Sequence, residues 1–351
     1  MSRLIIGSDP LARNLTFKFN DMKNVNSVFY VSKNQNLHKL IKEMKTPRTV
    51  ISTDNSPALV SRLCHAMDAG DSYVDFANEY HEDVKKKQMV YNNHSIEYIS
   101  GAISNSSVIM SGSKKVFENN KEFFESSFNR CEFIDNNSDV CQFVDMTMNA
   151  MNDSFIQGIY DVFAYGGQDA TTTIEFIESC KDTDIDGIIL RNFKLYNNMK
   201  LDKRIREYTI RHSIPCPIIC ATNDYITLNT YKKYINTHTP QNKCYDAKVA
   251  RNALRFLYAS VIIEALNILQ SRAIPIRAVM NFIKDESDLK CEMLSYNMDQ
   301  LHTVLDECEH DARMFMMQSL GVSIPCPSIQ AALNQHDLLN FFSVQGDEII
   351  I

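Results

Sequence analysis

The feature that most constrains the fold is a change in the apolar pattern near residue 140. Before it, seven β-rich runs alternate with polar stretches: RLIIG, NSVFYVS, PRTVIST, DSYVDFA, IEYISGAI, SSVIMSG and RCEFID. Parallel strands with crossover helices produce this alternation. After it, apolar residues recur at every third or fourth position, in runs that begin at Cys141, Thr171, Ala247 and Met293. Such spacing is typical of helices.

The chain therefore divides into an α/β part and an all-helical part. Its 351 residues are too many for one small core. We expect an α/β domain over residues 1–140, an all-helical domain over residues 141–340 and a C-terminal tail over residues 341–351. The tail ends in three isoleucines, which either pack on their own chain or add to a neighbouring subunit.

Composition excludes several classes of partner. The net charge is -7 and no basic stripe is visible, so we expect no nucleic-acid partner. No signal peptide and no apolar run of membrane-spanning length is visible, so we expect a cytoplasmic or nuclear protein that is not secreted and not in a membrane. The ten cysteines lack metal-ligand spacing, which predicts buried free thiols and no metal site. Intermolecular disulfides remain the alternative.

The stretch RLIIGSDPLARNL is similar to the opening of a dinucleotide-binding domain. Such a loop needs glycine at the turn, glycine beside the pyrophosphate, and a small residue where the helix meets the strand. Gly7 and Ala12 meet the first and third requirements, but Asp9 holds the middle position. Asp9 can instead cap the helix, with Pro10 at its first position, which fills the anion site with the protein's own charge. The alternative is a functional site, in which Lys33 follows the second strand and meets a 2′-phosphate.

Five segments, in order along nearly the whole chain, carry a family resemblance. They are LIIGSDPLARNLTFKFND, SYVDFANEYHEDVKKK, VARNALRFLYASVIIEALNIL, PIRAVMNFIKDESDL and GVSIPCPSIQAALNQHD. The last of them looks like the segment G-I-P-x-P-x-x-x-x-A-L-x-x-x-D of the 6-phosphogluconate dehydrogenase family, and the others resemble that family's corresponding segments. The resemblance implies a Rossmann-type α/β domain, degenerate in its loop, followed by an all-α domain that forms a homodimer.

The resemblance also assigns the family's chemistry to particular positions. FVDMTMNAMN stands where the family has F-V-K-M-V-H-N-G-I-E, which carries the base and the acid of an oxidative decarboxylation. Asp145 then replaces the catalytic lysine, Met148 the substrate-contacting histidine and Asn152 the glutamate acid, while Asn149 keeps its identity. A carboxylate in place of an ammonium repels a phosphorylated, carboxylate-bearing substrate by several kcal/mol, roughly, at a few Å.

Other departures from the family point the same way. Asn78 matches the nicotinamide-contacting asparagine, but Phe76 and Ala77 stand where the family has paired glycines. The substrate loop is reduced to ISGAISNSS, and Asn340 replaces the arginine that the resemblance implies for the sugar phosphate. The lysine-rich loop G-x-K-G-T-G-K-W has no counterpart. Together these changes predict a protein without cofactor and without catalysis.

Three hypotheses for function follow. The first is a structural protein that assembles with copies of itself, such as a viral matrix or occlusion-body lattice, for which sixteen methionines and ten cysteines supply contacts. The second is a regulatory pseudoenzyme that still binds NADP or a sugar phosphate. The third is an active NADP-dependent dehydrogenase with Asp145 or His81 as its base. His81 lies in the charged run NEYHEDVKKK, which we expect to form a solvated helix face.

Overall fold

The computed structural model describes most of the chain. The described residues are 2–7, 9–20, 30–31, 37–54, 56–104, 106–166, 170–186, 188, 203–227, 246–286, 291–321 and 324–345. They fall into two compact units, Met1–Asp145 (the sheet unit) and Met146–Ile351 (the helical unit). Residue 140, the expected domain boundary, is the first residue of helix α7 (Val140–Gly166).

The described part of the sheet unit holds seven strands, one at each predicted β-rich run. They are β1 (Ser2–Ile6), β2 (Tyr30–Val31), β3 (Arg48–Ser52), β4 (Ser72–Asp75), β5 (Glu97–Ser104), β6 (Ser107–Gly112) and β7 (Arg130–Asp135). Their order in the sheet is β2-β1-β3-β4-β5-β6-β7. The first five are parallel, whereas β6 is antiparallel to β5 and parallel to β7. The predicted parallel strands are thus found over most of the sheet, and β6 departs from that pattern because it pairs antiparallel with β5.

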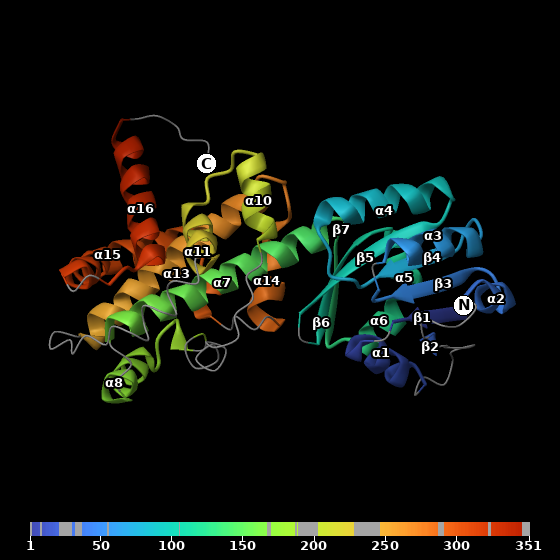
Figure 1. The fold of residues 1–351 in the computed structure, drawn as a ribbon, viewed down its shortest axis with the longest axis horizontal. Helices are drawn as coiled ribbons and strands as arrows, with labels where there is room; N and C mark the ends of the chain where they lie inside the picture. Colours follow the sequence, from blue (N-terminus) through green and yellow to red (C-terminus); the bar gives the residue numbers. More distant parts are fainter. Residues whose placement is uncertain are drawn as a thin grey trace. The chain divides into compact units, whose positions relative to one another are not determined.

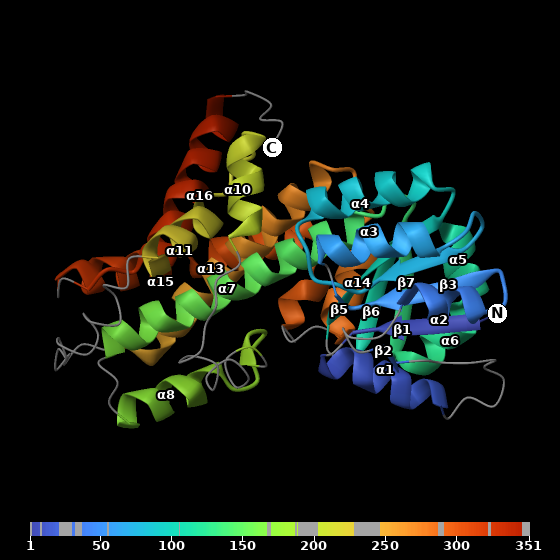
Figure 2. The same cartoon turned by 45° about the vertical axis from the view of Figure 1, so that its right-hand side comes forward.

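Helices cover both faces of this sheet (Figures 1 and 2). Since successive residues of a strand point to opposite faces, Leu4 and Ile6 enter one core cluster and Ile5 enters the other. The first cluster includes residues of α2 (Leu37–Glu43), α3 (Pro57–Ala66) and α4 (His81–Asn93). The second includes residues of α1 (Pro10–Asn20), α5 (Lys114–Asn119) and α6 (Lys121–Ser127). The predicted Rossmann-type α/β architecture is confirmed.

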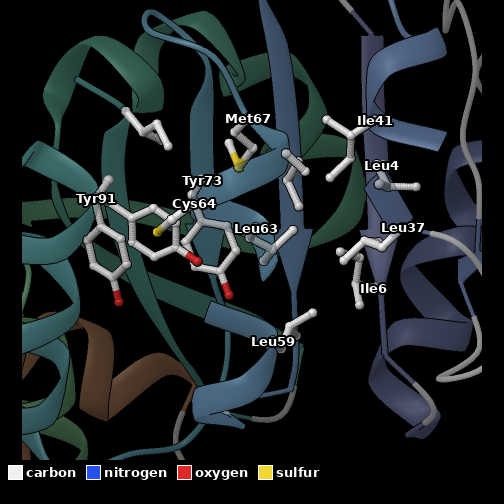
Figure 3. Packing of buried hydrophobic residues seen from close by; sticks show 14 of the residues in the cluster. Leu4, Ile6, Leu37, Ile41, Leu59, Leu63, Cys64, Met67, Tyr73 and Tyr91 are labelled. Atoms are coloured by element: carbon white, nitrogen blue, oxygen red, sulfur yellow. The ribbon is translucent and has the colours of Figure 1, made fainter. Parts of the chain in front are cut away.

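A stack of tyrosines lies in the first cluster. The ring centroids of Tyr73 and Tyr91 are 4.5 Å apart, and Tyr98 lies 5.8 Å from Tyr73 and 5.5 Å from Tyr91. Figure 3 shows Tyr73 and Tyr91 beside Cys64 and Leu63. Burial raises the pKa of all three phenols above the ordinary value.

The helical unit is built around α13 (Ala247–Gln270), which begins where the sequence predicts a helical run. Its other described helices are the rest of α7, α8 (Ala170–Cys180), α10 (Arg204–Arg211), α11 (Pro217–Thr227), α14 (Ile276–Glu286), α15 (Met298–Gly321) and α16 (Pro327–Gln345). Helix α13 packs against α8, α15 and α16. It is long and apolar enough to cross a membrane, but 89% of its most apolar window is buried inside the protein, which is typical of a core helix.

Two expectations for the helical unit need correction. The run from Met293 is not one helix, because a 3-10 turn (Glu292–Ser295) precedes α15. Asn297 starts α15 with a reciprocal cap: its Oδ1 accepts from Gln300 N at 2.8 Å, and its N donates to Gln300 Oε1 at 2.9 Å. The expected tail begins as helix, since α16 continues to Gln345, and residues 346–351 lie outside the described residues.

Candidate functional site

The carboxyl ends of β1 and β3 form the first part of the candidate site. The strands β2 and β3 lie on opposite sides of β1, so the order of the strands in the sheet reverses between β1 and β3. Open α/β sheets bind ligands at such a point. Gly7 follows β1 and Thr53 follows β3. A Cβ on Gly7 would lie 2.2 Å from Thr53 Oγ1 and 2.7 Å from Ala12 Cβ, so only glycine fits this turn. The close strand-to-helix packing expected of Gly7 and Ala12 is therefore present.

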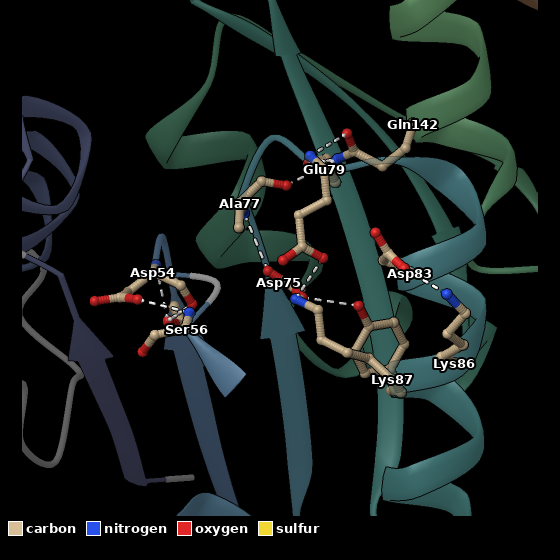
Figure 4. A network of polar contacts seen from close by, with 12 residues as sticks. Asp54, Ser56, Asp75, Ala77, Glu79, Asp83, Lys86, Lys87 and Gln142 are labelled. Carbon is tan, nitrogen blue, oxygen red and sulfur yellow. Dashed lines mark hydrogen bonds and ion pairs between the residues drawn. The ribbon is translucent and has the colours of Figure 1, made fainter. Parts of the chain in front are cut away.

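Asp9 occupies the amino end of α1. Its Oδ1 accepts from Ala12 N at 2.7 Å, and Pro10 is the first residue of the helix. The predicted self-cap is confirmed. Asp54, after β3, accepts from Ser56 N at 2.8 Å beside the start of α3 (Figure 4). The described residues thus place two carboxylates at this edge of the sheet, while Lys33 lies outside them.

A buried ionic network lies at the end of β4 (Figure 4). Asp75 Oδ2 accepts from Lys87 Nζ at 2.5 Å and from the Tyr98 hydroxyl at 2.8 Å, and Lys87 Nζ lies 2.7 Å from Glu79 Oε2. Burial alone lowers the pKa of Lys87, but attraction to the two carboxylates raises it overall. Burial and repulsion by Asp75 raise the pKa of Glu79 despite its pairing with Lys87.

The expectation of a solvated face for the run NEYHEDVKKK was therefore wrong at several positions. Glu79, which precedes α4, is buried, and so are His81 and Lys87 on α4 itself. His81, the alternative base, has its Nδ1 3.4 Å from Asp139 Oδ2, and its ring meets Phe143 edge-on. The sequence signal that was missed is Asp75, a carboxylate that ends an apolar strand and requires a buried cation.

The positions that the resemblance gives to the nicotinamide end differ in environment. Asn78 is exposed, while Phe76 and Ala77 are buried. The Phe76 ring lies 5.6 Å from that of Phe128, and a Cβ on Gly101 would lie 2.5 Å from it. Phe76 thus belongs to the second core cluster, in which its side chain fills space that a glycine would leave.

Helix α7 carries the positions that the resemblance assigns to catalysis. One face of the helix carries Asp145 and the residues three, four and seven positions after it, which are Met148, Asn149 and Asn152. Met148 is buried and the other three are partly exposed. Helix α7 contains no Lys, Arg or His along its whole length. It therefore supplies no lysine or histidine to take up a hydroxyl proton and no cation to hold a phosphate.

The structure also places two further positions at which the sequence departs from the family's substrate contacts. The described residues of the segment ISGAISNSS lie mainly in β5, and Ser104 pairs with Ser107 of the antiparallel β6. Asn340 is exposed on α16, with its Nδ2 3.1 Å from His336 Nε2. Among the described residues, no group of three or more His, Cys, Asp or Glu side chains is placed to hold a metal ion.

Comparison with solved structures identifies the architecture. A structure of Plasmodium falciparum 6-phosphogluconate dehydrogenase matches with a TM-score of 0.78 and 16% identity, over 97% of this chain and 92% of that chain. The chain has the 6-phosphogluconate dehydrogenase fold. At this identity the likeness concerns the fold alone.

Weaker matches come from two imine reductases, both with a TM-score of 0.44. The Bacillus cereus enzyme is 11% identical over 81% of this chain and 99% of its own. A Myxococcus stipitatus variant in complex with NAD+ is 12% identical over 72% of this chain and 92% of its own. No protein-family model and no curated protein matches the sequence.

Proposed function

We propose that this protein is a non-catalytic scaffold that assembles with copies of itself and no longer binds a pyridine dinucleotide. The observation that carries the proposal is the hydrogen bond from Ala12 N to Asp9 Oδ1. A dinucleotide phosphate binds the amino end of such a helix through free N–H groups and the helix dipole. Here a carboxylate already uses that end, and a diphosphate would bring like charges together.

The face of α7 supports the loss of catalysis. A 6-phosphogluconate-type reaction needs a base for the hydroxyl proton and cations for the phosphate and the carboxylate. The resemblance assigns those tasks to positions that hold Asp145, Met148 and Asn152, on a helix without any basic residue. A change at one position is ordinary divergence, whereas the concurrent loss of base, acid and cations favours a fold kept for its shape.

Exposed apolar side chains in the helical unit support self-association. Met317 and Leu320 lie on one face of α15 and are 60% and 59% exposed, and Leu338 on α16 is 58% exposed. Single exposed apolar residues are ordinary, but neighbours one helical turn apart favour a contact with a second copy. The proposed assembly is a homodimer or a higher lattice, as in a viral matrix or an occlusion body.

Thermal unfolding with added ligand tests the first half of the proposal. A ligand that binds only the folded state must raise Tm. We expect no rise for the wild type with millimolar NADP+, NADPH or 6-phosphogluconate. Asp9→Gly restores glycine at the middle position of the loop, and an NADPH-dependent rise in this variant alone would identify Asp9 as the block. A rise in the wild type would contradict the proposal.

Light scattering coupled to size-exclusion chromatography tests the second half. The expected mass is a multiple of the 40.2 kDa chain, and it falls when Met317 and Leu320 are both changed to Ser. Exchange of the buried Met316 is avoided, since it would disturb the core instead. A wild-type monomer at high concentration would contradict self-association.

The second candidate is a protein that still binds NADP, with or without turnover. It is favoured by the match over 97% of the chain to a protein whose structures include complexes with NADP+ and 6-phosphogluconate. The ligand titration above distinguishes this candidate from the scaffold. Formation of NADPH from NADP+ with 6-phosphogluconate or another hydroxy acid would favour an active dehydrogenase instead.

A further inference from the structure

Two cysteines meet at the start of α11. Cys216 precedes the first residue of the helix and Cys220 follows one turn later, with Cys220 N donating to the Cys216 carbonyl at 3.0 Å. Their Sγ atoms are 3.5 Å apart. Residues four apart in a helical turn have Cα atoms about 6 Å apart, which lies within the range that a disulfide spans.

The two thiols differ in their surroundings. Cys216 is buried, and its Sγ donates to Thr209 Oγ1 at 2.8 Å, whereas Cys220 is partly exposed. Seven of the nine described cysteines are buried, and Cys131 is the other partly exposed one. The start of α11 therefore combines an accessible thiol with a second sulfur in contact.

We propose that Cys216 and Cys220 form an oxidation site at which hydrogen peroxide or an organic hydroperoxide converts the two thiols into a disulfide within one helical turn. The Cys220 thiol loses its proton to solvent and its thiolate attacks the peroxide. The O–O bond breaks, and a sulfenic acid forms together with hydroxide (or alkoxide), which takes up the released proton to give water (or alcohol). Cys216 Sγ then attacks Cys220 Sγ, the S–O bond breaks, and the leaving hydroxide takes the Cys216 proton to form water. The thiols lose two electrons and the peroxide gains them.

The surroundings assign the order of these steps. The hydrogen bond with Cys220 and burial raise the pKa of Cys216, so its sulfur stays protonated. Cys220 is partly exposed, so water can solvate its thiolate and a peroxide can reach its sulfur. Cys220 is therefore the attacking thiol and Cys216 the resolving one.

The disulfide would constrain a helical turn whose backbone already forms hydrogen bonds with a side chain of α13. Ile218 N and Ile219 N, between the two cysteines, donate to the buried Glu264 carboxyl at 3.2 and 3.3 Å. Helix α11 also packs against α16. Oxidation thus adds a covalent link to the point where α11 is attached to α13.

Mass spectrometry of the full chain tests the proposal. Reduced protein is treated with hydrogen peroxide, alkylated with iodoacetamide and digested without reduction. The peptide that carries both cysteines should lose two hydrogen atoms and carry no alkyl group, and dithiothreitol should restore alkylation of both. Recovery of both cysteines in alkylated form, at a dose that oxidises Cys131, would overturn the proposal. So would a disulfide that joins Cys220 of two chains.

Variants test the order of attack. In Cys216→Ser, Cys220 should accumulate as a sulfenic acid that dimedone traps, and in Cys220→Ser, Cys216 should stay reduced. Cys131→Ser is the matched control and should form the disulfide as the wild type does. Oxidation of Cys216 in the Cys220→Ser variant at the wild-type rate would overturn the assigned order. The wild-type peptide mass decides whether the disulfide forms, even if a variant fails to fold.

Discussion

Two buried acids of the sheet unit and two of the helical unit are neutralised in different ways. In the sheet unit, Asp75 meets Lys87 at 2.5 Å and Asp71 meets Arg48 at 2.7 Å. In the helical unit, Glu264 accepts from backbone N–H groups at the start of α11, and Asp161 accepts from Ser328 N at the start of α16. These two acids of the sheet unit use cationic side chains, whereas Glu264 and Asp161 use the amino ends of helices. The helical unit also contains a pair of the first kind, since Asp184 lies 2.8 Å from Arg255 Nε.

This difference determines where protons are held. A cation beside a carboxylate keeps both groups charged, and the pKa of Lys87 is accordingly raised. Backbone N–H groups carry only partial charge, so burial outweighs them at Glu264 and raises its pKa well above the ordinary value. Folding therefore favours the protonated form of Glu264.

The largest expected effect is at Lys87. Lys87→Met leaves Asp75 and Glu79 buried without their cation, so we expect the free energy of unfolding to fall by about 3–5 kcal/mol in urea denaturation. The matched control is Lys86→Met. Lys86 pairs with Asp83 at 2.7 Å but is 71% exposed, so its removal should cost less than about 1 kcal/mol. Equal losses in the two variants would contradict the assigned role of the buried network.

Glu264→Ala is expected to have the next largest effect. It leaves the N–H groups of Ile218 and Ile219 unpaired and opens a cavity beside α11, for a loss of about 3 kcal/mol. Glu264→Gln keeps the volume and one acceptor and should lose less. The same urea experiment measures both, and a loss under about 1 kcal/mol for the alanine variant would contradict the assigned cap.

The pH dependence of stability isolates the proton on Glu264. Its folded pKa lies above its unfolded value of about 4.3, so its contribution is complete below that pH and is lost as pH rises through the folded pKa. The wild type should lose stability relative to Glu264→Gln above about pH 5, by at most about 1.4 kcal/mol per pH unit. Urea midpoints from pH 5 to 8 measure this difference. A difference that is constant with pH would mean that Glu264 ionises as it does in the unfolded chain.

A smaller effect is expected at Asp161. Both Gln157 Nε2 and Ser328 N donate to the Asp161 carboxylate. Asp161→Asn places an amide donor against one of these two donors, so we expect the free energy of unfolding to fall by about 2 kcal/mol. Asp306→Asn on the exposed face of α15 is the control and should change stability by less than about 0.5 kcal/mol. Calorimetric Tm values compare the two variants.

The smallest effect is expected at Asp9, where the cap is local and only partly buried. Asp9→Ala should cost about 1 kcal/mol, while Asp9→Ser keeps a capping oxygen and should cost less. Urea denaturation measures both. If serine were as costly as alanine, the hydrogen bond to Ala12 N would not stabilise α1.

Local features of the molecule could be predicted from the sequence. The seven β-rich runs each carry a strand, and α13 starts at the predicted Ala247, because apolar periodicity and turn residues act over neighbouring positions. The Asp9 cap was predictable for the same reason, since donor and acceptor are three residues apart.

Features that join distant residues could not be predicted. Glu264 reaches Ile218 across 46 positions, and Asp161 reaches Ser328 across 167. A signal was nevertheless present, because each acid stands alone in an apolar run, ASVIIEAL for Glu264 and GIYDVFAY for Asp161. An isolated carboxylate in such a run predicts a buried acceptor, although not its donor. The reversal of β6 was missed because apolar patterns carry no strand direction.

The tyrosine stack of the sheet unit has an optical consequence. The chain contains no tryptophan, so its near-ultraviolet absorbance comes mainly from fifteen tyrosines. Phenols in water have a pKa near 10. The pKa values of Tyr73, Tyr91 and Tyr98 are raised in the folded protein, so these three rings keep their protons at that pH. In an alkaline titration, phenolate from these three rings would therefore form only as the layer between the sheet and α4 opens, which gives the unit a built-in spectroscopic reporter.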